Sequence, residues 1–205
     1  MRRPLQLVLG CVVLGAGIGL LLRAQLGSDG FSLAAFGLAR RTGLPFGLVN
    51  AAVGLTMVGL AAALGVRPGA GTLVQPVVVG FAAQLTLDVV PAPPALLTRG
   101  AMLIAAMAVL AVGIAAYLAA GLGAGPLEAL STGLADRAQA RWGGPRRFAA
   151  AYSCLQLVLA GTGWAFGAAP GVGTVAVVAG LGPAVARLLP LLTPAPGAGT
   201  PVPSR

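Results

Sequence analysis

A five-residue sequence occurs twice in this chain, as PGAGT at residues 68–72 and as PGVGT at residues 170–174. Each copy interrupts one long apolar run and precedes another. A second pair lies upstream, where LGSDG at residues 26–30 matches LGAGP at residues 122–126, 96 positions later. Two landmarks repeated in the same order indicate an internal duplication, which constrains the fold more than any single motif does.

The composition indicates that the chain lies in a lipid bilayer. Of its 205 residues, 58% are hydrophobic and 8% are charged, and the mean hydropathy is +0.94. A soluble domain has about 25% charged residues, so this chain has too few charged side chains to cover a surface in water. The net charge of +9 comes from arginines that stand mostly between the apolar runs, where they set topology. We therefore expect a lipid environment and no nucleic-acid partner.

The apolar runs predict six transmembrane helices, because about 20 apolar residues suffice for one crossing. The expected crossings are residues 5–24, 46–66, 72–90, 101–122, 148–167 and 174–192. Each half also contains a shorter helix, expected at residues 31–41 and 126–141, which re-enters the membrane or lies at its surface. Residues 193–205 are rich in Pro, Gly, Ala and Thr and are expected to form a disordered tail.

Residues 1–92 and 93–192 would each form a membrane repeat with three crossings. An odd number of crossings forces the second repeat to insert in the opposite sense, so the predicted fold is an all-α membrane protein of two inverted three-helix repeats. With the N-terminus inside, eight arginines fall on the inner side and four on the outer side. The positive-inside rule then predicts that both termini are cytoplasmic. If the short helices cross the membrane instead, the repeats run parallel.

The two PGxGT turns allow two interpretations. Proline stops the preceding helix, glycine adopts backbone angles that other residues resist, and threonine suits an N-cap whose oxygen accepts a free N–H. The free N–H groups at such a helix start attract anions, which would make the turns a pair of solute sites. Alternatively, each is only a tight turn that was duplicated with the gene. The candidate residues are Gly69, Gly71, Thr72, Gly171, Gly173 and Thr174.

Carboxylates stand near the start of both short helices. Asp29 precedes the first, and Glu128 follows Pro126 at the start of the second. Either carboxylate could simply cap its helix. If the short helices re-enter the membrane, however, the two carboxylates face one another across the interface between the halves and line a cavity. Asn50 and Gln84, polar residues within crossings, are further candidates, although such residues often only bind neighbouring helices together. The same holds for Gln75, Tyr152, Gln156 and Arg187.

We expect no enzymatic activity, cofactor or metal. The chain has no histidine, and its sequence contains no metal-ligand cluster and no Ser/His or Cys/His arrangement. Cys11 and Cys154 both lie inside apolar runs, which argues against a structural disulfide. An intramembrane enzyme would need Asp29 or Glu128 as its base.

The order of these motifs resembles that of the bacterial YczE/YitT-like integral membrane proteins (YczE/YyaS/YitT), over residues 5–190. The likeness rests on residues 26–30, residues 42–47 with Asn50, and residues 68–72, 123–126 and 171–174. This chain has Asp29-Gly30-Phe31 where the family tends to have Asp-Pro-Trp, and Leu127-Glu128 where it tends to have Arg-Asp, so no arginine role carries over. The resemblance implies a multi-helix protein of the bacterial inner membrane whose solute or partner is unassigned.

These observations predict a secondary transporter or permease for a small polar or anionic metabolite. In this interpretation Asp29 and Glu128 couple ions or protons, and the glycine turns hold the solute. Two alternatives stay open: a non-transporting accessory protein that binds a partner through the arginine-rich loop at residues 137–147, and a channel. The sequence also leaves homo-oligomerisation open.

Overall fold

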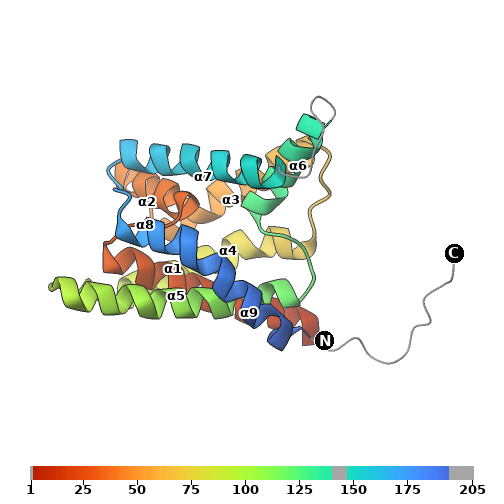
Figure 1. Cartoon of the computed structure of the whole chain (residues 1–205). Coiled ribbons are helices and arrows are strands. Elements are labelled where there is room, and N and C mark those ends of the chain that lie inside the picture. The colour runs from red at the N-terminus through yellow and green to blue at the C-terminus, as the bar shows by residue number, and fades with distance from the viewer. Residues whose placement is uncertain (1, 140–146, 194–205) are drawn as a thin grey trace, which may run out of the picture.

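The computed structural model describes residues 2–139 and 147–193, and the regular structure of these residues is helical throughout (Figure 1). The elements are α1 (Arg2–Ala24), α2 (Gly30–Thr42), α3 (Phe46–Ala63), α4 (Ala70–Val89), α5 (Leu96–Ala119), α6 (Pro126–Gln139), α7 (Arg147–Ala165), α8 (Val172–Ala176), the π-helical segment η1 (Val177–Leu181) and α9 (Gly182–Leu192). Residues 140–146 of the arginine-rich loop and residues 194–205 of the predicted tail lie outside the described residues.

Several of these helices indicate a membrane location. Within the described residues, five stretches are long and apolar enough to cross a bilayer: Arg3–Ala24, Phe46–Ala63, Ala70–Val89, Leu96–Ala119 and Val172–Leu192. They correspond to five of the six expected crossings. The sixth, α7, is not among them and carries the polar residues Tyr152, Ser153 and Gln156.

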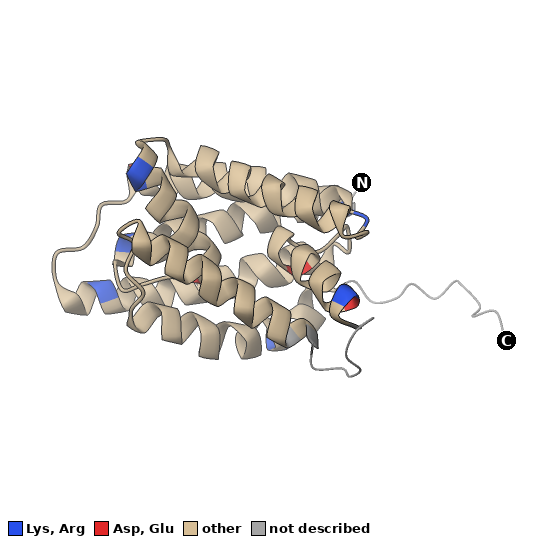
Figure 2. Cartoon of the chain, turned by 90° about the horizontal axis from the view of Figure 1, so that it is seen from above, with Lys and Arg blue, Asp and Glu red and all other residues tan. Residues whose placement is uncertain are grey.

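The distribution of side chains agrees with a lipid environment. Large apolar side chains face outward, among them Leu97, which is 86% exposed, and Leu191, which is 78% exposed. Most arginines gather at the two ends of the helices (Figure 2). An apolar belt between two charged ends is what a bilayer requires of a spanning protein.

Helices α1 and α5 make the most extensive contact in the bundle, and they cross through glycines. A Cβ added to Gly17 would lie 2.9 Å from the backbone nitrogen of Leu110, and one added to Gly113 would overlap the backbone nitrogen of Leu14. Both contacts join equivalent residues, because Leu110 and Gly113 stand 96 positions after Leu14 and Gly17. Rising residue numbers in α1 meet falling numbers in α5, so the two helices run antiparallel.

Each short helix packs against a long helix from the other half of the chain. Helix α2 lies along α7, and α6 lies along α3. Glycines again allow the close approach, since a Cβ on Gly37 would lie 2.7 Å from the Gly163 carbonyl oxygen. Each half therefore packs its short helix on a long helix of the other half. The contact of α2 with α7 corresponds to the contact of α6 with α3.

Helix α2 begins at the middle of the bundle. Its first residue, Gly30, lies against Gln156 in the middle of α7. Near its other end, Arg40 donates a hydrogen bond of 3.3 Å to the Gly167 carbonyl, just beyond α7. These two points on α7 are about 16 Å apart along the helix axis. The loop after α1 thus brings the chain from one end of the bundle back to its middle.

Helix α6 repeats this arrangement. Pro126, its first residue, lies 3.6 Å from the Cβ position of Gly54 in the middle of α3. Near its other end, Arg137 donates a hydrogen bond of 3.1 Å to the carbonyl of Ala63, the last residue of α3. Both short helices therefore start at mid-depth and end at a surface of the bundle.

The PGxGT turns bind the loops that precede the short helices, and each turn binds the loop of the other half. The Gly71 N–H donates to the Leu122 carbonyl at 2.8 Å, and the Gly173 N–H donates to the Leu26 carbonyl at 2.6 Å. A Cβ on Gly171 would lie 2.5 Å from that Leu26 oxygen, so a larger residue would displace the loop. The repeated motifs thus form two equivalent clasps between the halves.

The threonine of each PGxGT turn is not at the N-cap position that the sequence predicted. The N-cap residues are Gly69 and Gly171, and Thr72 and Thr174 are each the third helical residue. The prediction that threonine is the N-cap was therefore wrong. Its hydroxyl oxygen does accept a backbone N–H, from Gly69 at 3.3 Å and from Gly171 at 3.2 Å, because the third position also faces the turn.

The last apolar stretch is not a continuous α-helix. The π-helical segment η1 separates α8 from α9, whose second residue is Pro183. Proline has no N–H, so one backbone hydrogen bond is missing at this point, and the π-helical segment lies just before it. The equivalent helix of the first half, α4, stays α-helical through Pro76. The break therefore distinguishes the two halves, and its residues face the cavity described next.

Candidate functional site

A cavity of about 630 Å³ lies in the middle of the bundle, where α2 and α6 begin. Its polar lining consists of Asp29, Ser32, Asn50, Gln75, Tyr117, Glu128, Tyr152, Ser153 and Gln156. Asp29, Asn50 and Glu128 were predicted as site residues, and the structure brings them together. They line one cavity because both short helices begin at the middle of the bundle.

The apolar lining is duplicated. Leu14 and Ile18 of α1 recur 96 positions later as Leu110 and Ile114 of α5, and all four line the cavity. Gln75, Pro76 and Val79 of α4 recur 102 positions later as Val177, Val178 and Leu181 of η1, which also line it. The cavity is thus built from corresponding surfaces of the two halves.

Asp29 is both a helix cap and part of the cavity wall. It is the N-cap of α2, and its carboxylate accepts hydrogen bonds of 3.1 Å from the Ser32 N–H and from the Ser28 hydroxyl. These bonds fix the orientation of the carboxylate. The two interpretations of Asp29 from the sequence, cap and site residue, are therefore compatible.

Glu128 lies in the first turn of α6 and lines the same cavity as Asp29. Its Oε2 atom lies against Gly125, and the side-chain amide of Gln75 approaches the same glycine. Of the residues that the structure describes, no arginine is part of this lining. Two carboxylates without a cationic neighbour give the cavity a negative potential, which low surrounding polarity strengthens.

Several hydrogen-bond acceptors in the cavity wall have no donor within the part of the chain that the structure describes. Asn50 is fully buried; its Nδ2 donates to the Pro76 carbonyl at 3.0 Å, while its Oδ1 has no partner among the described residues. The same is true of Gln75 Oε1 and of the hydroxyl of the fully buried Ser32. An unsatisfied buried polar group costs about 1–3 kcal/mol, so this wall is better satisfied by a polar ligand than by an empty apolar space.

Gln156 joins α2 to α7 at the cavity edge. Its Oε1 accepts from the Phe31 N–H at 3.3 Å, and its Nε2 donates to the Tyr152 hydroxyl at 3.3 Å. This supports the structural interpretation of Gln156, namely that it binds neighbouring helices together.

Three polar lining residues, Ser32, Tyr117 and Ser153, were not candidates in the sequence. The repeat offset could have identified Ser32, because it stands 96 positions before Glu128. Tyr117 lies on α5 and Ser153 on α7, and the sequence does not reveal which face of either helix is turned inward.

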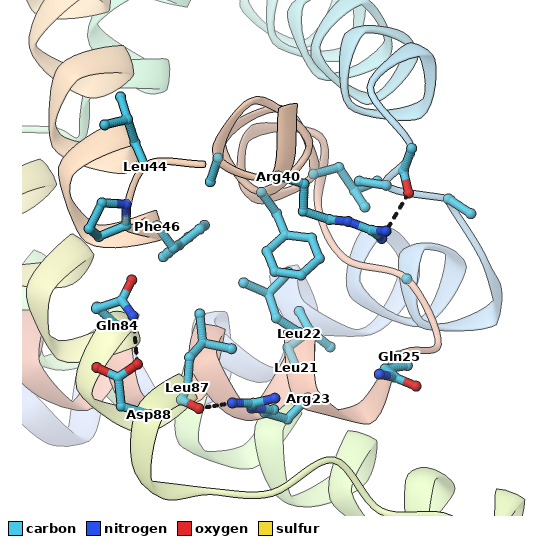
Figure 3. A pocket seen from close by; sticks show the side chains of 18 of the residues that line it. Leu21, Leu22, Arg23, Gln25, Arg40, Leu44, Phe46, Gln84, Leu87 and Asp88 are labelled. Atoms are coloured by element: carbon cyan, nitrogen blue, oxygen red, sulfur yellow. Dashed lines mark hydrogen bonds between the residues drawn. The ribbon is translucent and has the colours of Figure 1, made fainter. Parts of the chain in front are cut away.

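Gln84 lies elsewhere, in a second cavity of about 830 Å³ at the end of the bundle where α1 and α4 finish (Figure 3). Its amide accepts from the Gly47 N–H at 3.2 Å and donates to the Asp88 carboxylate at 2.7 Å. Arg23 and Arg40 also line this cavity, and both donate to backbone carbonyls, of Leu87 and Gly167. Gln84 therefore braces α3 against α4 and does not meet Asp29 or Glu128.

The six turn residues line neither cavity. At least one N–H of each turn, that of Gly71 and that of Gly173, already donates to a carbonyl of the other half. Each turn therefore has at least one N–H fewer to offer to an anion at the start of its helix. The geometry favours the turn interpretation over the solute-site interpretation.

Comparison with known proteins finds a family of unknown function (DUF6198) that matches residues 1–190. An uncharacterized protein of Haemophilus influenzae (strain ATCC 51907 / DSM 11121 / KW20 / Rd) is 27% identical over 184 residues, which make up 90% of this chain and 82% of that protein. No solved structure matches. Neither match carries the YczE/YitT name or a solute, so that resemblance stays a prediction.

Proposed function

Because the chain belongs to the DUF6198 family, whose function is unknown, we propose a function from the cavity: the protein is a secondary transporter for a small polar solute. The observation that carries this proposal is a cavity at mid-depth whose walls are duplicated surfaces of both halves. Sites of this kind, placed between repeats at interrupted helices, are characteristic of secondary transporters. We propose no enzymatic activity.

The proposed architecture has six crossings, α1, α3, α4, α5, α7 and the stretch from α8 to α9, in two inverted three-helix repeats. Its support is that the contacts of the two halves correspond. Helix α1 packs on its counterpart α5, the pair α2 and α7 corresponds to the pair α6 and α3, and the two clasps are equivalent. In this arrangement α2 and α6 are re-entrant helices, since each starts at mid-depth. Alternating access would then come from movement of one repeat against the other around the cavity.

The proposed location is a bacterial inner membrane with both termini in the cytoplasm. The support is the arginine count of the sequence, eight on the side of the N-terminus against four on the other side.

Asp29 and Glu128 would couple the solute to protons or cations, because a charged carboxylate at this depth costs at least about 2.5 kcal/mol unless it is neutralised. Of the polar and anionic solutes expected from the sequence, the two carboxylates favour a solute without net negative charge.

Flux into proteoliposomes tests the proposal. We expect protein reconstituted in phosphatidylethanolamine and phosphatidylglycerol vesicles to take up at least one solute from a panel of labelled polar metabolites. Uptake should saturate with concentration and should show counterflow when the vesicles are preloaded with the same solute. Uptake that rises without saturation indicates a channel, and no uptake of any solute would contradict the transporter.

A further inference from the structure

The charge of the central cavity restricts its ligand. Asp29 and Glu128 contribute two carboxylates to one cavity, and none of the described arginines joins them. A ligand with a positive charge would neutralise part of this potential inside the low-dielectric interior, where Coulomb interactions are stronger than in water. A carboxylate or phosphate ligand would add a further negative charge to the same space.

The hydrogen-bonding groups restrict it further. The Asn50 amide is held by its bond to the Pro76 carbonyl, so the oxygen left without a partner is fixed as an acceptor. Gln75 Oε1 is a second acceptor to which no described residue donates. Together with the carboxylate of Glu128, these atoms call for a ligand that carries several N–H donors. A primary ammonium group has three donors and no acceptor.

The remaining wall is apolar or aromatic. Leu14, Ile18, Leu110 and Ile114 form the side of α1 and α5 that faces the cavity, and Tyr117 and Tyr152 add two aromatic rings. Apolar walls favour an apolar ligand body, and tyrosine rings attract a cation that lies over their faces. A volume of about 630 Å³ leaves room for a body of several carbons beside the charged head.

We infer that the central cavity binds organic ammonium ions, with the ammonium group between Glu128, Asn50 and Gln75 and an apolar body against α1 and α5. This inference rests on the proposed transporter and names its class of solute. Because one cation or protons can satisfy the two carboxylates, exchange of an organic cation for protons is the form of coupling that fits the cavity.

Isothermal titration calorimetry with three matched compounds tests the ligand class. Phenethylammonium, 2-phenylethanol and phenylacetate have similar size and differ in charge. For purified protein in an uncharged maltoside detergent, we expect phenethylammonium to bind at least roughly 30-fold more tightly than the other two, as one buried charge pair would give. Equal or tighter binding of the alcohol or the carboxylate, or no binding of phenethylammonium, overturns the inference.

The variant Glu128→Gln keeps the shape of the side chain and removes its charge. We expect it to lose roughly 30-fold in affinity for phenethylammonium. Asp136→Asn is the matched control, because Asp136 lies on the same helix, is exposed and is not part of the cavity; its affinity should equal that of the original protein. Unchanged affinity in Glu128→Gln overturns the assignment.

Binding and flux separate the two proposals. If phenethylammonium binds as expected but no ammonium ion or metabolite crosses proteoliposomes, the ligand class holds and the transporter is wrong. If the metabolite panel shows saturable flux but phenethylammonium does not bind, the transporter holds and the ligand class is wrong.

Discussion

Gly113→Ala is expected to destabilise the protein, although alanine is the better helix former. A Cβ at this position would overlap the backbone of Leu14, which cannot rotate away as a side chain could. Helices α1 and α5 would have to separate at the centre of the bundle. We expect a loss of roughly 3 kcal/mol from overpacking, which exceeds the gain of about 1 kcal/mol in helix propensity.

Alanine substitutions at two further glycines, Gly17 and Gly59, should cost less stability than Gly113→Ala. Gly17 is the equivalent residue on α1, but its Cβ would lie farther from the facing backbone, 2.9 Å from the Leu110 nitrogen, so Gly17→Ala should cost less than Gly113→Ala. Gly59 on α3 has no atom within 4 Å of its Cβ position, so Gly59→Ala should be neutral or stabilising. Thermal unfolding followed by size-exclusion chromatography measures all three. An equal loss of stability in Gly59→Ala and Gly113→Ala would contradict close packing at Gly113 as the cause.

Glu128→Gln is expected to abolish solute flux while the fold is kept. Flux should fall by more than roughly 30-fold, because the interaction lost is that of one buried charge with its partner. The melting temperature should stay equal or rise, since the substitution removes an uncompensated charge from the bundle interior. Proteoliposome uptake and thermal unfolding on the same preparation test both parts. A variant that transports normally, or that is inactive only because it is unfolded, would contradict the role of Glu128.

Two substitutions of Asp29 distinguish its role as a helix cap from its role in transport. Asn can still accept the Ser32 N–H that caps α2, so Asp29→Asn should keep its stability and lose flux. Asp29→Ala removes the cap as well and should cost about 1 kcal/mol of stability in addition. If both variants keep full flux, Asp29 is only a cap.

The sequence predicted most of the order of elements, because that order depends on chain-local patterns. Apolar runs bounded by Gly, Pro and Arg marked the long helices, and the position of Asp29 marked the start of α2. The meeting of Asp29 and Glu128 in one cavity also followed from the sequence, on the condition that both short helices return to mid-depth. The condition itself could not be derived, since it depends on α7 and α3, which lie far away in the chain.

What the sequence could not supply was the partner of each motif. The PGxGT pattern describes a tight turn, but nothing in it indicates that Gly71 donates to Leu122 of the other half. The rotation of a long apolar helix is equally hidden, which is why Tyr117 was missed. The residues Gly180, Gly182 and Pro183 lie in the last apolar stretch of the sequence, but they do not by themselves indicate a π-helical segment.

The central claim is that the two halves insert in opposite senses around the cavity, and cysteine labelling of its two turns tests it most directly. Arg67 and Ala169 are exposed, equivalent residues that directly precede the PGxGT turns. In a background with Cys11→Ala and Cys154→Ala, a membrane-impermeant maleimide applied to intact cells should label the Ala169→Cys protein and leave the Arg67→Cys protein unlabelled. Inverted membrane vesicles should give the reverse pattern. Labelling of both positions from the same side would contradict the inverted repeats and the solute cavity between them.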